Sequence, residues 1–468
     1  MTSMVATIYE SNGAQARGMS RRAVIVRGSA LLGGGALIAA CSGPTGSAEK
    51  PADIKGPVAL RWSTWGDDAH PFNTDAAPKG MALFNQKYPN IKVQIEPQNT
   101  GWEAKNTTEW IAGTGPDLSG HCCSQGPAWG SQGLFLKLDP YLKRDAKAVP
   151  TQDYVEWLMK LFATPSQAGQ WALPMYTGTV HLFYNKALFQ KKGLPFPDET
   201  WDWNKWRDMA LKVAEPANNL WARNDVGAGG MYKRLQSADA HVVDPNDNTK
   251  AAFATDKAIA AFEFERDSIY KDKSVAPGGG PNQPDAMKNL GFNGFGQQAL
   301  GRVAMWEGGS FTVTRYVQYL SDQIDWDMAP LPKGPTGRIT LATSDGWSIW
   351  NGTKNKDASW ELLKFLQSDE WTDIATRVAG QQSARKSFQQ KWLQAFKEAN
   401  PKVADKNLKW AADAIEKNYA RPIEFFLKDD DSKKIYTDAY NAAVRDGTAE
   451  VGATMKAAAD QINQINKG

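Results

Sequence analysis

The chain has 468 residues, of which 42% are hydrophobic, 22% charged and 11% aromatic, and this balance excludes a disordered or fibrous chain. At about 100 to 200 residues per domain, the length predicts two domains. Four of the 54 basic residues but only one of the 51 acidic residues lie in residues 1–40. The remaining residues therefore carry equal numbers of positive and negative charges, and they have no net positive charge that would attract nucleic acid.

The start of the chain has the pattern of an export signal. Arg21 and Arg22 precede apolar residues, and residues 30–40 form an unbroken run of small and apolar side chains that ends at Cys41. The run is shorter than the roughly 20 residues of a membrane-spanning helix. We therefore predict a signal peptide over residues 1–40.

Residues 37–41, Leu-Ile-Ala-Ala-Cys, resemble a bacterial lipobox, which predicts a lipid on Cys41. The alternative is a general secretory signal with a coincidental cysteine. Residues 41–57 are small, polar and proline-rich, and predict a flexible tether. The body is then expected outside the cell membrane, in the periplasm or at the cell surface, held at the membrane's outer face. The start codon stays open between Met1 and Met19, as does the choice between general secretory and twin-arginine export.

The first part of the body predicts a β-α-β unit. Residues 58–65 alternate as in a strand, a helix passes through 81–84, and residues 91–96 alternate again. A helix around 110–112 ends at the glycines and proline of 113–116, before another short strand. Strands that alternate with helices indicate an α/β fold.

Two adjacent cysteines, Cys122 and Cys123, follow this strand. They can form a vicinal disulfide in an oxidising compartment or remain two buried thiols, and the sequence leaves both open. With four histidines in the chain and no CxxC pair, we predict no zinc site, no other metal and no cofactor.

Strands and helices continue to alternate through the rest of the chain. We expect helices up to Phe162, strands over 170–174 and 180–185, a helix capped by Thr200, a helix over 257–270, strands near 303–305 and 347–350, and an almost wholly helical segment from Asp357 onward. This helical last third is expected to wrap a sheet.

Seven short stretches carry a family resemblance. In chain order they are Phe84 with 88–93, 112–118, 173–174 leading to 183–186, 193–195 before 200–201, 301–305, 330–335, and 344–347 before 360–366. In this order, and after a lipoprotein-like start, they resemble the bacterial extracellular solute-binding proteins typified by the maltodextrin-binding protein. Those are the capture subunits of sugar importers driven by an ATPase.

The resemblance implies an α/β, two-lobed periplasmic-binding-protein fold of type II, with a cleft between the lobes and a helical C-terminal third. Matched by segment, lobe 1 would hold 58–176 plus 308–344, lobe 2 would hold 181–305 plus 347–468, and the crossings would lie near 176–181, 305–307 and 345–347. A solute would bind in the cleft and the hinge would close around it.

A sugar site needs flat aromatic rings against C–H faces and short polar side chains for hydroxyls. The chain has 19 tryptophans, most of which we expect to be structural. The loop residues expected at the cleft are Trp65, Asp67, Asp68, His121, Ser124, Tyr176, Thr177, Trp306, Glu307, Ser310, Asp345, Gly346 and Trp347.

The carboxylates in that set allow a second interpretation, a secreted glycosidase that uses paired acids. GxSxG, HExxH and Walker motifs are absent from the sequence, so any ATPase must be a separate chain. We therefore expect a binding protein and no catalytic residues.

The expected cleft set contains acids but no Arg or Lys, which favours a neutral or cationic solute. The leading hypothesis is a monomeric, lipid-anchored protein that captures a carbohydrate, in particular an oligosaccharide, and passes it to membrane permease subunits. The alternative solute is a glycerol phosphodiester or another polar molecule, which would use guanidinium donors. Arg385 stands where relatives have a proline-containing segment, so its role is open.

Overall fold

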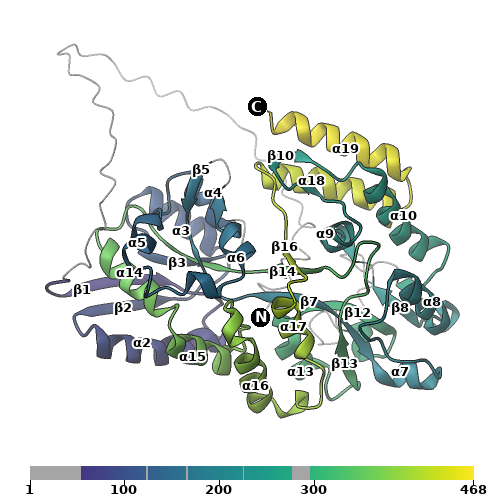
Figure 1. Ribbon diagram of the computed structural model, residues 1–468, viewed down its shortest axis with the longest axis horizontal. Coiled ribbons are helices and arrows are strands. Elements are labelled where there is room, and N and C mark those ends of the chain that lie inside the picture. The colour runs from purple at the N-terminus through teal and green to yellow at the C-terminus, as the bar shows by residue number, and fades with distance from the viewer. Residues whose placement is uncertain (1–53, 123–124, 165–166, 225, 277–295, 468) are drawn as a thin grey trace.

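The computed structural model describes residues 54–122, 125–164, 167–224, 226–276 and 296–467. The predicted signal peptide, Cys41 and most of the tether lie outside these residues. Two lobes, each built around its own sheet, lie side by side (Figure 1). Among the helices described, none is both long and apolar enough to cross a membrane.

The first lobe is built on a five-stranded sheet. Its strands, in spatial order, are β2 (Ile91–Glu96), β1 (Val58–Ser63), β3 (Leu118–His121), β15 (Gly346–Ile349) and β6 (Leu173–Pro174). Its helices are α2 (Ala77–Lys87), α3 (Trp102–Ile111), α4 (Gln125–Ser131), α5 (Asp139–Arg144), α6 (Glu156–Leu161), α14 (Lys356–Phe365) and α15 (Asp369–Ala379). Strands β1 and β2 are parallel and joined through α2, which confirms the predicted β-α-β unit.

The second lobe is built on a seven-stranded sheet. Its strands are β11 (Val275–Ala276), β8 (Trp221–Asn224), β12 (Val303–Gly309), β7 (Gly178–Asn185), β14 (Thr340–Thr343) and β16 (Ala420–Pro422), with β13 (Trp326–Ala329) also paired to β7. Successive side chains of β7 point to opposite faces, so Leu182 packs in one core of this lobe and Phe183 in another.

Helices cover both faces of this sheet. The Leu182 face packs against α7 (Lys186–Lys191), α8 (Trp203–Val213), α9 (Gly227–Ser237), α10 (Asp256–Tyr270), α18 (Asp429–Tyr440) and α19 (Val451–Ile465). The Phe183 face packs against α12 (Gly296–Ala299), α13 (Val313–Tyr319), α16 (Gln389–Ala399) and α17 (Lys409–Glu416). The cap of α8 is Asp202, which accepts from Lys205 N at 2.8 Å, so the predicted cap Thr200 is wrong.

Smaller elements complete the described chain. Two hairpins are formed by β4 (Ala163–Thr164) with β5 (Gln167–Gln170), and by β9 (Val243–Asp244) with β10 (Asp247–Ala251). Short 3-10 and π turns are η1 (Phe72–Ala76), η2 (Thr151–Asp153), η3 (Pro216–Asn218), η4 (Ser310–Thr312), η5 (Lys386–Phe388), η6 (Pro401–Val403) and η7 (Asn441–Arg445).

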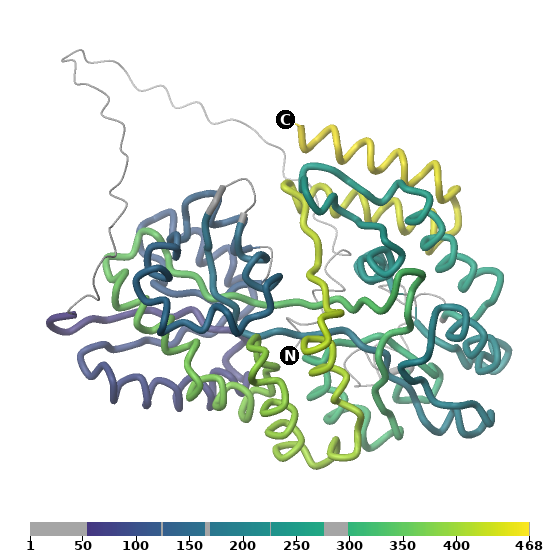
Figure 2. The backbone as a smooth tube through the Cα atoms, viewed as in Figure 1, coloured from purple at the N-terminus to yellow at the C-terminus, as the bar shows by residue number. Residues whose placement is uncertain are grey.

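Within the residues that the structure describes, the chain crosses between the lobes at three places, which can be followed in Figure 2. Residues 175–177 join β6 to β7, residues 344–345 join β14 to β15, and residues 380–388 join α15 to α16. The crossings are bonded to one another: Thr177 N donates to the carbonyl of Gln382 at 2.9 Å, and Ser344 Oγ donates to the carbonyl of Tyr176 at 2.5 Å. The three segments therefore form one connected hinge.

The structure divides the chain differently from the predicted lobes. Residues 308–344 were expected in lobe 1, but β13 and β14 pair with β7 in the second sheet. Residues 347–468 were expected in lobe 2, but β15, α14 and α15 pack in the first lobe. The predicted crossing at 305–307 is wrong because β12 continues through it, paired with β7 as far as Gly309.

Candidate functional site

The carboxyl ends of β1 and β3 meet two of the three crossings. In open α/β sheets, ligands bind outside the carboxyl ends of parallel strands. Strand β1 leads into Trp65 and β3 leads into Cys122, while the crossings contribute Tyr176 and Asp345. These four residues, which we call the hinge cluster, come from four separate stretches of the chain.

Asp345 is the centre of the hinge cluster. Its carboxylate accepts a hydrogen bond from the Tyr176 hydroxyl at 3.0 Å, and the side chains of Cys122 and Trp65 also donate to it. The residue is only 6% exposed. Burial raises the pKa of Asp345 to about 6, although the three hydrogen bonds act in the opposite direction. The site therefore holds a carboxylate that is costly to leave ionised without further hydrogen-bond donors.

Trp65 supplies a partly exposed aromatic ring beside this carboxylate. Its ring centroid lies 5.6 Å from that of Tyr176 and 4.4 Å from that of His70, both at steep angles. The Asn73 amide fixes the loop by donating to the carbonyls of Trp65 and Gly66 at 3.0 and 2.8 Å, and Gly66 has a φ of 83° that favours glycine. The ring is thus held by a rigid backbone.

Glu307 lies in the second lobe and is held by two cations. Its carboxylate contacts Lys233 Nζ at 2.6 Å and forms an ion pair with Arg234, both from α9. Burial raises its pKa, but Arg234 and Lys233 outweigh burial and lower the pKa of Glu307 below its usual value. A carboxylate kept ionised in this way is unsuited to act as the general acid of a glycosidase.

Thr177 lies in the hinge, and Ser310, the first residue of η4, is bonded to the hinge. The Ser310 hydroxyl accepts from Thr179 N at 3.1 Å and donates to Gln382 Oε1 at 2.8 Å. Gln382 also receives the Thr177 N–H through its carbonyl, so it ties the third crossing to the first. Both predicted site residues are buried, and their polar groups are used within the protein.

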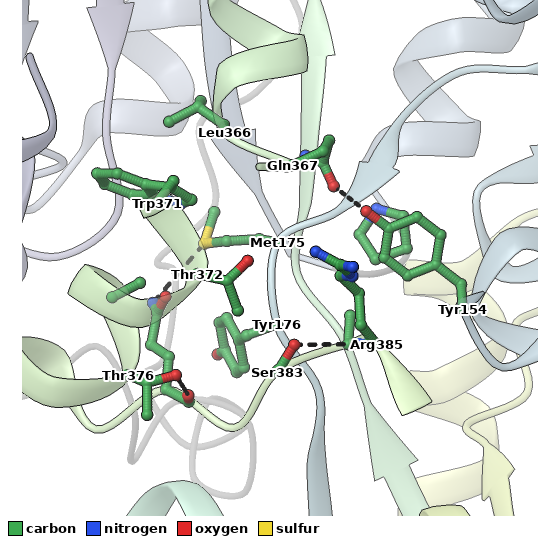
Figure 3. Close-up of a pocket in the computed structure, with 14 residues that line it drawn as sticks. Tyr154, Met175, Tyr176, Leu366, Gln367, Trp371, Thr372, Thr376, Ser383 and Arg385 are labelled. Atoms are coloured by element: carbon green, nitrogen blue, oxygen red, sulfur yellow. Dashed lines mark hydrogen bonds between the residues drawn. The ribbon is translucent and has the colours of Figure 1, made fainter. Parts of the chain in front are cut away.

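A small cavity of about 20 Å³ lies between α15 and two of the crossings (Figure 3). It is lined by residues of α15 and of two crossings, among them Met175, Trp371 and Gln381. This volume is enough for one water molecule and far too small for a sugar. Arg385 lines it as well, but its guanidinium donates to Asp153 at 2.9 Å and to Asp369, so the structure gives this arginine a role in fixing the third crossing.

Three predicted site residues are in the lobe interiors, which corrects the expectation that they face the cleft. Trp347 is fully buried in the first core beside Trp62, and Trp306, 3% exposed, packs in a core of the second lobe. His121, 1% exposed, lies at 2.8 Å from Ser348 Oγ through Nε2, and burial lowers its pKa to about 4.

The other predicted residues are placed as follows. Asp67 and Asp68 are exposed on the loop after β1, where Asp68 accepts from Asn99 Nδ2 at 2.9 Å. Gly346 is buried, and a Cβ there would lie 2.8 Å from the Phe162 ring, which explains the glycine by packing. Ser124 lies outside the described residues.

Cys122 is the member of the hinge cluster that the sequence did not assign to the site. The sequence showed only two adjacent thiols, and their spacing gives no sign of an aspartate more than two hundred residues away. Cys123 lies outside the described residues, so the choice between a vicinal disulfide and two buried thiols stays open. In the part of the chain with coordinates, no group of three or more His, Cys, Asp or Glu side chains is arranged to hold a metal ion.

A family model described as "Bacterial extracellular solute-binding protein" matches residues 70–373, well over half of the chain. A binding protein of Brucella abortus strain 2308 is 25% identical over 315 residues, which cover 63% of this chain and 71% of the relative.

Solved structures of similar fold include a cyclic alpha-maltosyl-1,6-maltose binding protein from Arthrobacter globiformis, with a TM-score of 0.72 and 16% identity over 88% of this chain and 100% of the neighbour. An ABC substrate-binding protein from Listeria monocytogenes in complex with cycloalternan has a TM-score of 0.70 and 16% identity over 87% and 99%. UgpB from Mycobacterium tuberculosis in complex with glycerophosphocholine has a TM-score of 0.68 and 18% identity over 88% and 98%. They agree with the predicted two-lobed fold.

Proposed function

This chain belongs to the bacterial extracellular solute-binding protein family, and from that premise we propose that it captures a carbohydrate between its lobes and delivers it to the permease of an ABC importer. The observation that carries the proposal is the hinge cluster. It combines a rigid, partly exposed indole of Trp65 with the carboxylate of Asp345, at the point where two crossings meet the strand ends.

The chemistry of the hinge cluster suits a polyhydroxylated solute. A carboxylate accepts strong hydrogen bonds from two hydroxyls at once, and the indole face packs against sugar C–H groups. New hydroxyl donors would relieve the cost of ionising the buried Asp345 carboxyl. Two of the structural neighbours are described with cyclic sugars, cycloalternan and cyclic alpha-maltosyl-1,6-maltose, which supports an oligosaccharide.

Titration calorimetry tests the proposal. The full chain, with Cys41→Ser to keep it in solution, is titrated with glucose, maltose, maltotriose and glycerophosphocholine, and tryptophan fluorescence reports lobe closure. We expect heat and a spectral change with at least one sugar, and weakening of that binding by Asp345→Asn. No response to any of the three sugars would refute the carbohydrate proposal.

The glycerol phosphodiester is the second candidate solute, favoured by the neighbour in complex with glycerophosphocholine. Tight binding of glycerophosphocholine with no response to sugars would establish it. The glycosidase alternative predicts release of nitrophenol from 4-nitrophenyl glycosides that Glu307→Gln abolishes. We expect no release above the buffer rate.

We also propose that Cys41 carries a lipid that holds the body at the outer face of the cytoplasmic membrane, where it works as a monomer. The family is one of extracellular proteins, which supports export. Cells expressing the full chain and fed labelled palmitate should place label on the wild type and none on Cys41→Ser. Equal labelling of both, or a membrane fraction unchanged by the substitution, would refute the anchor.

A further inference from the structure

The second lobe lacks an aromatic platform at the positions that the sequence predicted, because Trp306 is buried in a core. A solute held between two lobes needs contacts from both of them. The segment from β16 to α18, residues 420–428, is a candidate source because it rises between the lobes (Figure 1). Strand β16 pairs with β14 of the second sheet, and it also lies against α6 of the first lobe.

Glu424 fixes this segment to the second lobe. Its carboxylate accepts from the backbone N–H groups of Val242 and Val243 at 2.8 and 2.9 Å and from Gln236 Nε2 at 2.8 Å. His241 Nδ1 lies 2.6 Å from it. Phe426, two residues after Glu424, is buried in the core of the same lobe. Residues 424 and 426 therefore anchor the backbone on both sides of residue 425.

Phe425 points the other way, toward the first lobe. It is only partly buried and packs against a small apolar cluster of Leu161, Phe162 and Ala172. Cys122 of the hinge cluster packs against the same apolar cluster. The Lys433 ammonium lies 4.9 Å from the centroid of the Phe425 ring, and this cation–π contact helps to orient the ring.

We propose that Phe425 is the aromatic platform that the second lobe contributes to the solute site. It is the counterpart of Trp65 in the first lobe: a partly exposed ring, held by a fixed backbone, at the lobe junction beside the hinge cluster. This inference rests on the proposed carbohydrate function. It adds a residue whose flat aromatic ring would favour solutes that present a C–H face for it to pack against.

The test compares four variants with the wild type by calorimetry, with maltotriose as the probe. Phe425→Ala removes the ring. Phe425→Leu keeps the apolar packing on the first lobe but removes the flat face, whereas Phe425→Trp keeps the flat face. Leu427→Ala is the matched control, since Leu427 lies in the same segment and is 53% exposed. A thermal melt of each variant verifies folding.

If the ring is a platform, Phe425→Ala and Phe425→Leu weaken maltotriose binding by about 5- to 150-fold, by analogy with the range for nucleic-acid bases stacked on aromatic side chains. The affinities of Phe425→Trp and Leu427→Ala for maltotriose stay within about threefold of the wild-type affinity. Wild-type affinity in Phe425→Leu would overturn the inference and leave the carbohydrate function standing. No binding of glucose, maltose or maltotriose by the wild-type chain would overturn both.

Discussion

Replacing Asp345 by Asn should change how the stability of the protein depends on pH. The pKa of this carboxyl rises from its usual value of 3.8 to about 6 in the folded chain, because the group is buried. The folded state then binds more protons than the unfolded state between these two values, so stability falls as pH rises through that window. At 1.36 kcal/mol per tenfold change, ionised Asp345 costs about 3 kcal/mol above pH 6.

Urea unfolding at pH 4 and at pH 7.5 measures this cost. The side-chain amide that replaces the carboxyl in Asp345→Asn cannot ionise, so the free energy of unfolding of this variant should improve relative to the wild type by about 2.5 kcal/mol between the two pH values. The control is Asp208→Asn, which removes an exposed carboxylate from a surface ion pair with Lys212. Parallel pH profiles for the wild type and Asp345→Asn would refute the burial of an ionisable carboxyl at the hinge.

Two further substitutions separate stability from binding. Glu307→Gln leaves Lys233 and Arg234 without their shared counter-charge, so urea unfolding should show a loss of about 3 to 5 kcal/mol; a loss below about 1 kcal/mol would contradict the buried ion pair. Trp347→Ala opens a cavity in the first core and should also cost about 3 to 5 kcal/mol, while calorimetry of the folded protein shows maltotriose affinity unchanged; a selective loss of affinity would return this ring to the solute site.

Local patterns in the sequence predicted the parts of the site that depend on strand ends. Trp65 comes just after the strand predicted from the alternating residues near 58–65, so its place beyond the carboxyl end of β1 could be predicted from the sequence. Tyr176 and Asp345 came from matching the family's crossings, and both lie in crossing segments of the structure. In each case, the prediction depended only on the position along the chain at which a strand ends.

The predictions that were wrong depended on pairing across the chain or on which face of a strand a residue takes. Strand β13 pairs with β7, about 140 residues earlier, and nothing near residue 326 indicates which sheet it will join. Side chains alternate along a strand, so Trp306 and Glu307 point to opposite faces although they are neighbours in sequence. The strand was expected to end near Met305 but continues to Gly309, so Trp306 lies within β12 on a buried face and not in a loop.

In the proposed function, the position of Asp345 would link solute recognition to lobe movement. Asp345 lies in the two-residue crossing 344–345, and its hydrogen-bond donor Tyr176 lies in another crossing. The hydrogen bonds of Asp345 therefore depend on how the two crossings are arranged. A solute whose hydroxyls donate to the ionised carboxylate would stabilise the arrangement of the crossings in which that carboxylate is accessible to it. By thermodynamic linkage, the protein in that arrangement would also bind the solute more tightly. Protonation removes the negative charge of Asp345 and turns one of its oxygens into a donor, so the charge-assisted hydrogen bonds from solute hydroxyls are lost. Maltotriose affinity should therefore fall as pH drops below about 6, and Asp345→Asn should abolish this dependence. Calorimetry at pH 5 and pH 7.5 measures both, and equal affinities for the wild type at the two pH values would show that solute binding does not use this carboxylate.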